Sequence, residues 1–169
     1  AYIGQFVIMS LVVQIDLLYL NAKNMDLQMD NINSMIRLNI DIAIVMVIWI
    51  VQLIIYPAFH NINQYTFLSW HHNYMGKISL LIAPLMITQA IIIIDQCIKR
   101  GNIYTYLSLF FMILVWTTTF FYSVPCHNKL QSIGYNANTV NILINTNWIR
   151  TISWTLCLLF SIIIYKKGL

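Results

Sequence analysis

The chain has 169 residues, of which 60% are hydrophobic and 8% are charged, and its formal net charge is +4. Soluble domains carry about 25% charged residues, so this composition excludes an ordinary soluble protein and predicts an all-α integral membrane protein. The sequence contains no glutamate, and its five acidic residues lie at the edges of apolar runs or between them. Because the basic residues flank apolar runs, we expect a lipid bilayer as the partner and no nucleic acid.

Residues 1–20 are apolar but include Gln5, Gln14 and Asp16. This segment lacks the basic start and the small-residue cleavage site of a secretory signal. We expect an N-terminal apolar helix, and we favour a fifth transmembrane helix over a helix in the plane of the membrane. The polar residues 21–37 that follow have no apolar period long enough for a span, so they are predicted to form a linker.

Residues 38–169 contain four apolar runs that are long enough to cross a membrane. A transmembrane helix needs about 20 apolar residues, and a shorter run can be completed by lysines whose charged ends reach the headgroups. We therefore predict a four-helix transmembrane bundle with spans at 42–59, 78–94, 101–126 and 151–165.

The distribution of basic residues predicts the orientation of this bundle, because lysine and arginine are retained on the cytoplasmic side. Six lie on one side of the spans and three on the other: Lys23, Arg37, Lys99, Arg100, Lys166 and Lys167 against Lys77, Lys129 and Arg150. The loop at 96–103 and the C-terminus are predicted to be cytoplasmic. The loops at 58–77 and 123–149 are predicted to be extracytoplasmic.

This topology brings all four histidines to the extracytoplasmic end, in the predicted loops. With an adjacent cysteine they are the candidate metal ligands: His60, His71, His72, Cys126 and His127. Haem sites in membrane four-helix proteins usually hold their axial histidines inside the helices, and here none of the predicted spans contains a histidine. A bound metal or haem and a set of plain surface histidines therefore stay open as alternatives.

Helical spacing places polar residues on one face of the first span and one face of the fourth. The two faces are Trp49, Gln52 and Tyr56, and Asn147, Arg150, Thr151 and Trp154. We expect these faces to meet. Arginine beside hydrocarbon must be satisfied, so Arg150 either clamps loop carbonyls or Gln52, or receives an anionic or carbonyl-bearing ligand. The candidate cluster contains Gln52, Tyr56, His71, His127, Asn147, Trp148, Arg150 and Thr151.

Three prolines mark expected changes in the helices. Pro57 and Pro125 are predicted to stop the first and third helices, because proline lacks the backbone N–H and disfavours helix in the residue before it. Pro84 lies inside the second span, where we expect it to kink the helix and free a carbonyl.

Four blocks of sequence carry a resemblance to a known group: "YPAFH", "HHNYMGKISLLIAPLM", "VPCHNKLQSIGYN" and "NTNWIRTISWT". Together they resemble small, functionally unassigned bacterial four-helix membrane proteins, which are distantly similar to the anthrone-oxygenase-like family. The resemblance covers about residues 38–166 and implies a bacterial inner-membrane protein. By position it implies functional roles for Tyr56, Pro57, His71, Pro84, Pro125, His127, Asn147, Trp148, Arg150 and Thr151. The chain departs from the group at Gln89, where an acidic residue is expected.

Two functions remain in view from the sequence. The first is a small accessory subunit of a larger membrane assembly, because the chain contains no catalytic motif and its apolar surface is large for so short a chain. The alternative is a membrane oxygenase or redox enzyme, in which His127 and His71 act as base or metal ligands while Arg150 and Asn147 polarise a carbonyl. A transporter is least expected, because four spans without an internal repeat give little room for alternating access.

Overall fold

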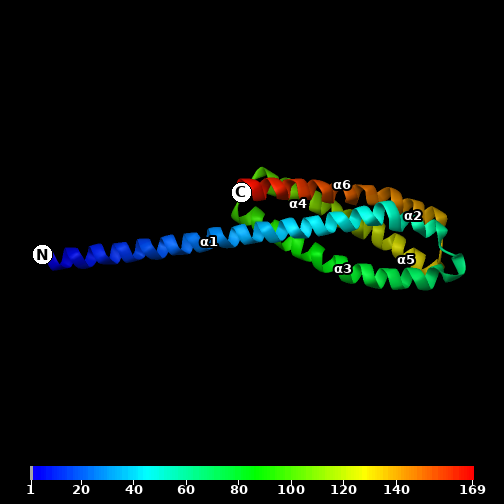
Figure 1. Cartoon of the computed structure of the whole chain (residues 1–169), viewed down its shortest axis with the longest axis horizontal. Helices are drawn as coiled ribbons and strands as arrows, with labels where there is room; N and C mark the ends of the chain where they lie inside the picture. Colours follow the sequence, from blue (N-terminus) through cyan, green and yellow to red (C-terminus); the bar gives the residue numbers. More distant parts are fainter. Residues whose placement is uncertain (1) are drawn as a thin grey trace.

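The computed structural model describes the backbone of residues 2–169 and the side chains of residues 17–26 and 28–169. Over residues 2–169 the chain is helical apart from short turns and contains no strand (Figure 1). Its elements are α1 (Tyr2–Ile50), the π-helical turn η1 (Val51–Ile55), α2 (Tyr56–Ala58), the 3-10 turn η2 (Phe59–Asn61), α3 (Gln64–Lys99), α4 (Ile103–Thr118), the π-helical turn η3 (Thr119–Ser123), α5 (Val124–Ile133) and α6 (Ala137–Lys167).

Asparagines set the starts of three of these helices. The side-chain oxygens of Asn63, Asn102 and Asn136 accept hydrogen bonds of 2.9 Å from backbone N–H groups in the first turns of α3, α4 and α6. Such N-caps satisfy amide groups that have no partner within the helix. Short turns connect four long helical segments, which we call rods: Leu17–Asn61, Gln64–Lys99, Ile103–Ile133 and Ala137–Lys167. The rods lie side by side in alternating directions (Figure 1).

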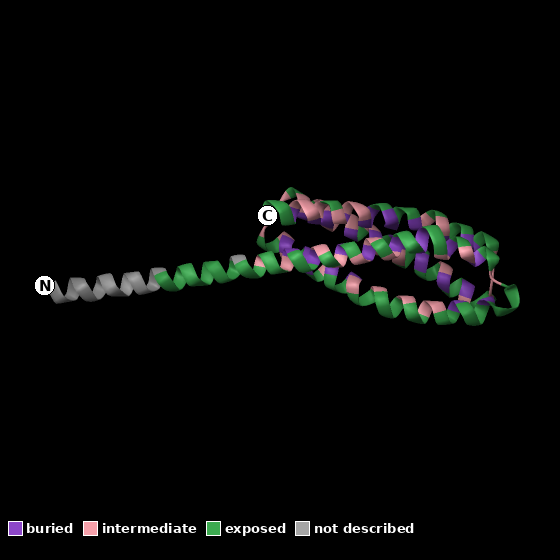
Figure 2. Cartoon of the chain, viewed as in Figure 1, coloured by how far each residue is buried: buried purple, intermediate pink, exposed green. Residues whose placement is uncertain are grey.

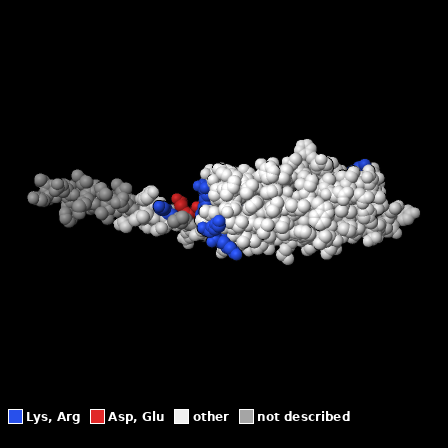
Figure 3. Space-filling model, turned by 90° about the horizontal axis from the view of Figure 1, so that it is seen from above, with Lys and Arg blue, Asp and Glu red and all other residues white. Residues whose placement is uncertain are grey.

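The two ends of the bundle differ in their residues. The turns near residues 62 and 135 lie together at one end, which we call the histidine end, and the turn near residue 101 lies with the C-terminus at the other (Figure 1). Lysines and arginines gather at this second end, which we call the basic end, where α1 extends past the other helices (Figure 3).

The helix α6 packs against both α1 and α4, and the buried residues lie along the bundle and not along the projecting part of α1 (Figure 2). Ile44, Val115, Leu143 and Trp154 are among the fully or almost fully buried core residues. The helix α3, which contains Pro84, bows away from α1 (Figure 1). The core is therefore tightest around α6.

Four helical segments are long and apolar enough to cross a membrane: Leu17–Asn61, Gln64–Lys99, Ile103–Ile133 and Ala137–Lys167. Apolar residues cover much of their outer surface; Leu80 and Phe121, for example, are 80% and 73% exposed. An apolar exterior of this extent is what contact with lipid requires. The all-α architecture with four apolar helices, as predicted from the sequence, is confirmed.

The prediction that residues 58–77 and 123–149 form histidine-bearing loops was wrong, because helices occupy most of these residues. The helix α3 begins at Gln64, α5 fills Val124–Ile133 and α6 begins at Ala137. Hydropathy marks the apolar part of a helix and does not mark its end, so the polar first turns of α3 and α6 cannot be distinguished from loop by hydropathy.

The predicted helix stops at Pro57 and Pro125 were also wrong, and each proline follows a π-helical turn. The turn η1 ends at Ile55 and η3 ends at Ser123, two residues before the respective proline. A π-helical turn is wider than an α-helical one, so it makes room for the proline ring, which in an α-helix would clash with the carbonyl group four residues earlier. Helical structure therefore continues past both prolines.

Residues 21–37, the predicted linker, continue α1 without a break. They change from exposed positions such as Met25 to the buried Ser34 and Arg37. The division into 1–20, 21–37 and 38–169 stays a prediction about the parts of the chain. A membrane role for residues 1–20 falls largely outside the described side chains.

Candidate functional site

The polar face of the first rod, at the end of α1 and in η1, meets the polar face of α6 inside the bundle. Asn147 Nδ2 donates to Gln52 Oε1 over 2.7 Å, and both residues are buried. Thr151 is buried one turn further along α6, where its hydroxyl donates to the Asn147 carbonyl. Trp148 lies at the edge of this cluster, 39% exposed, with its ring edge-to-face against Trp49. These contacts tie the first and fourth rods together.

A chain of three side chains lies nearer the histidine end. The Nε2 atom of His127, on α5, lies 3.1 Å from the Tyr56 hydroxyl. The Nδ1 atom of the same histidine lies 3.0 Å from Nε2 of His71. Tyr56 opens α2 directly after η1, and His71 lies two turns into α3. All three residues are buried. The chain therefore links three helices by two hydrogen bonds whose direction depends on the histidine tautomers.

Aromatic rings enclose the far end of this chain. The ring of His71 stacks on Phe67 at 5.5 Å with planes 12° apart, and Phe59 meets it edge-on at 5.7 Å. His71 Nδ1 is buried and has no hydrogen-bond partner in the described part of the protein. The hydrogen-bonded chain thus runs from the Tyr56 hydroxyl to a histidine that aromatic rings enclose.

Arg150 lies deep within α6 and not at its opening, because α6 begins at Ala137. The residue is 8% exposed. Its Nη1 donates to Ser123 Oγ over 2.7 Å, and its guanidinium carbon lies 5.2 Å from the centre of the Trp154 ring. The expected clamp on Gln52 or on loop carbonyls was wrong, because Ser123 of η3 is the hydrogen-bond partner.

The buried Arg150 lacks a carboxylate partner within the described side chains. The ion pairs there are Arg37 with Asp41, Lys99 with Asp95 and Arg100 with Asp30. The Nε of Arg150 is buried and also unpaired among these residues. Neutral hydroxyl groups and an aromatic face therefore surround a positive charge in an apolar interior, and this charge has no counter-ion among the described side chains.

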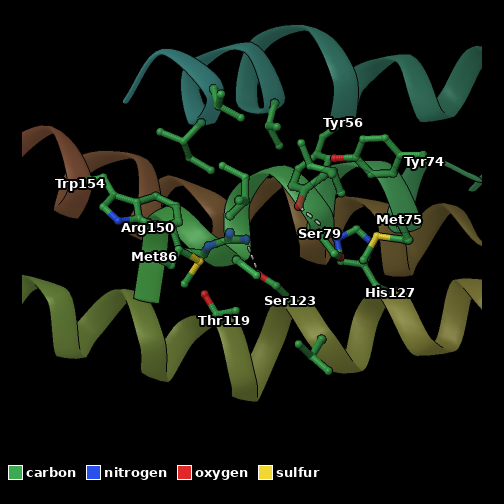
Figure 4. A pocket seen from close by; sticks show the side chains of 17 residues that line it. Tyr56, Tyr74, Met75, Ser79, Met86, Thr119, Ser123, His127, Arg150 and Trp154 are labelled. Atoms are coloured by element: carbon green, nitrogen blue, oxygen red, sulfur yellow. Dashed lines mark hydrogen bonds between the residues drawn. The ribbon is translucent and has the colours of Figure 1, made fainter. Parts of the chain in front are cut away.

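A cavity of about 180 Å³ lies beside this guanidinium, lined by residues of all four rods (Figure 4). Its polar lining comes from Tyr56, Tyr74, Ser79, Thr119, Ser123, His127 and Arg150, and its other lining residues are mainly apolar. Ser79 and Ala83 of α3 and Val124 of α5 are lining residues that are also exposed. The cavity therefore opens sideways between α3 and α5, through the outer surface of the bundle.

A second polar cluster, toward the basic end, was missed in the sequence analysis. Arg37 and Asp41 are both fully buried, with Nε and Oδ2 3.4 Å apart. Arg37 also donates to Gln96 and Ser108. Gln89 donates to Asp41 over 2.6 Å. The available signal was the spacing of Arg37 and Asp41 by four residues, which places opposite charges on one helix face.

Gln89, the departure from the resembled group, joins the two clusters. Its Oε1 accepts a hydrogen bond of 3.1 Å from Trp154 Nε1, and its Nε2 contacts Asp41. Trp154 in turn lies under the Arg150 guanidinium. The buried carboxylate of this region is therefore supplied by Asp41 of α1, on the opposite helix.

The candidate metal ligands do not converge. Only His71 and His127 contact one another. His60 is exposed and lies 2.9 Å from the Tyr135 hydroxyl, and His72 is exposed on α3. Cys126 is half-buried. Within the described side chains, no three histidine, cysteine or acidic groups lie close enough to hold a metal ion.

The chain matches no protein-family model, no curated protein and no solved structure. The resemblance to unassigned bacterial membrane proteins and to the anthrone-oxygenase-like family stays a prediction. The site geometry alone therefore carries the functional argument.

Proposed function

We propose that this chain is an integral membrane protein of the bacterial inner membrane, with four helices that cross the bilayer. The four long apolar segments and their exposed apolar side chains support insertion. The segment Leu17–Asn61 has 45 residues, which is about twice what a crossing needs. Part of α1 therefore projects from the membrane on the side of the basic end.

The basic end faces the cytoplasm in this proposal, and the histidine end faces outward. Lysines and arginines cluster where α3 meets α4 and where α6 ends (Figure 3). Basic residues are retained on the cytoplasmic side during insertion. The cavity then lies in the outer half of the membrane, next to α5 and the start of α3.

The proposed function is to bind, within this cavity, a small apolar molecule that carries an anionic or carbonyl oxygen. The observation that carries the proposal is Arg150, a buried guanidinium that lines the cavity without a carboxylate partner. An unpaired arginine in hydrocarbon costs roughly 2.5 to 3.5 kcal/mol on insertion scales. An oxygen of the ligand would satisfy the guanidinium and offset this cost.

The size and the wall of the cavity restrict the ligand further. An apolar cavity of about 150 Å³ accommodates benzene, so about 180 Å³ accommodates one six-membered ring with an oxygen substituent. The side opening at Ser79 and Ala83 faces the surface that lipid would cover. A ligand dissolved in the membrane can therefore reach the cavity directly, and a longer apolar tail can remain outside it.

Equilibrium dialysis of the purified protein in lipid nanodiscs against 4-nitrobenzoate tests this function. The probe is one ring with a carboxylate, and its absorbance reports the bound fraction. We expect saturable binding by the wild type and at least a tenfold lower affinity in Arg150→Gln. Lys129→Gln, at an exposed basic residue of the histidine end, is the matched control and should bind like the wild type. Equal binding by Arg150→Gln would exclude Arg150 as the anion site.

A role as an accessory subunit is a second proposal, supported by the exposed extension of α1. Leu18 and Met25 are 69% and 64% exposed where α1 passes beyond the other rods (Figure 2). Large apolar side chains on an isolated helix favour contact with another membrane protein subunit. Purification of the native complex in mild detergent tests this, since a chain that elutes alone would argue against a stable assembly.

An oxygenase or redox activity stays an alternative proposal. The positions of His127 and Tyr56 in the cavity wall support acid or base chemistry on a bound ligand. A haem or metal centre has less support than acid or base chemistry, because the candidate metal ligands among the described side chains do not converge.

A further inference from the structure

We propose that the ligand is a weak acid, with an ionisable O–H group on an apolar body about one ring in size. Tyr56, His127 and His71 take up its proton, while Arg150 holds the anion that results. This inference rests on the proposed binding function and adds a proton transfer to it.

The hydrogen-bonded chain begins at the cavity and leads away from it. Tyr56 and His127 line the cavity, whereas His71 lies behind His127 and does not. Arg150 lines the same cavity from α6, and Figure 4 shows its guanidinium on the same hollow as the Tyr56 and His127 side chains. One ligand oxygen can thus face both a fixed positive charge and the start of a proton-accepting chain.

The two transfers within the protein join atoms that already lie 3.1 and 3.0 Å apart. The proposed starting state is the pair of tautomers in which the Tyr56 hydroxyl donates to His127 Nε2 and His127 Nδ1–H donates to His71 Nε2. The ligand O–H gives its proton to the Tyr56 oxygen as the tyrosine proton passes to His127. The Nδ1 proton of His127 then passes to His71. The products are a ligand anion, neutral Tyr56, neutral His127 and a His71 imidazolium.

Two features of the site offset part of the cost of charging a buried histidine once the ligand is bound. The proton stays in the site, so the net charge of the site, supplied by Arg150, does not change. The anion lies beside the Arg150 guanidinium, and the imidazolium lies against the faces and edges of Phe67 and Phe59, where cation–π attraction stabilises it. The anion also separates the guanidinium from the charged histidine.

Several other ionisable groups lie near the hydrogen-bonded chain of Tyr56, His127 and His71, and in this proposal the histidines accept the ligand proton. Tyr74 of α3 contacts both imidazole rings, and His72 is the neighbour of His71 in sequence but is exposed. Cys126 of α5 and Arg150 of α6 are the remaining ionisable groups nearby. Arginine stays protonated in proteins, so it can attract an anion but cannot accept its proton.

The spectrum of bound 4-nitrophenol tests the inference, because the neutral phenol and its phenolate absorb at different wavelengths. The measurement is made in nanodiscs, one pH unit below the midpoint of the free probe, where about one molecule in ten is ionised. We expect the ratio of ionised to neutral probe to rise at least about tenfold on binding. A pH-indicator dye in weak buffer should record no proton released into solution.

Two variants interrupt the hydrogen-bonded chain of Tyr56, His127 and His71, and a third variant is the control. His127→Gln and Tyr56→Phe should still bind the probe, but mainly as the neutral phenol, so that the ratio of ionised to neutral bound probe falls about tenfold from its wild-type value. His60→Gln changes an exposed histidine at the same end and should leave the spectrum unchanged. The two chain variants alter different helices, so a folding defect in one leaves the other to decide.

The possible results separate the inference from the function on which it rests. If wild type binds neither 4-nitrophenol nor 4-nitrobenzoate, the binding function is overturned and the proton transfer with it. If 4-nitrophenol binds as phenolate equally in the wild type, His127→Gln and Tyr56→Phe, Arg150 alone ionises the probe and the proton-accepting chain is overturned. In that case the binding function stands.

Discussion

Arg37 and Asp41, one turn apart on α1, form an ion pair in which both side chains are completely buried. Replacing Asp41 by Asn leaves the guanidinium charge uncompensated in the core. Breaking a buried pair from one side costs about 3–5 kcal/mol, so we expect a loss of stability of that order. Unfolding of the detergent-solubilised protein by added SDS, followed by circular dichroism, measures the change.

The matched control for this prediction is Asp95→Asn, which breaks the exposed pair with Lys99. Exposed pairs contribute about 0–1 kcal/mol, so this variant should unfold almost like the wild type. A loss in Asp41→Asn no larger than that in Asp95→Asn would contradict the buried position of the Arg37 and Asp41 pair.

The hydrogen bond from Asn147 to Gln52 should couple α6 to η1, the turn that continues α1. Hydrogen bonds between membrane helices contribute about 0.6 kcal/mol on average and at most about 1.7 kcal/mol. A double-mutant cycle of Gln52→Leu and Asn147→Leu, measured by the same unfolding assay, should give a coupling energy within that range. The same cycle on Trp49 and Asn147, which share no hydrogen bond in the structure, is the control. Strict additivity of the Gln52 and Asn147 variants would show that the two amides do not interact.

The orientation of the bundle predicts which positions an impermeant thiol reagent can reach in intact cells. Asn138 lies at the histidine end and Lys166 at the basic end, and both are exposed. In a variant without the native cysteines, Asn138→Cys should react with a charged maleimide before lysis, and Lys166→Cys only after it. The reverse pattern would place the histidine end in the cytoplasm and move the cavity to the inner half of the membrane.

The sequence predicted the rods well because their signal is local. Long uncharged runs are sufficient to identify four apolar helices, and a spacing of three or four residues places Gln52 and Asn147 on faces that meet. The partner of Arg150 was not predictable in the same way. Ser123 lies in η3 on another helical segment, and the contact with Arg150 depends on how the two segments are rotated against one another, which spacing along one helix does not determine.

The buried Arg37 and Asp41 pair shows a different limit. In the sequence both residues lie beside a polar segment, and such charges usually face water. Their burial depends on Gln89, Gln96 and Ser108, which come from two other helices. Contacts of this kind depend on how the rods are rotated against one another, which hydropathy does not determine. For the same reason, the sequence could group the histidines at one end but could not pair His71 with His127.

Closing the side opening should block the cavity without removing any group that holds a ligand. Ala83 of α3 lines the cavity and is exposed, so a phenyl ring in Ala83→Phe has room to lie across the opening. We expect the association rate of 4-nitrobenzoate in nanodiscs, followed by stopped-flow absorbance, to fall at least tenfold, with little change in stability because the new ring replaces no buried side chain. Ile87→Phe, one turn along the same helix at a residue that is 51% exposed and outside the cavity lining, is the matched control and should bind normally. An unchanged association rate in Ala83→Phe would mean that the ligand reaches Arg150 by another route.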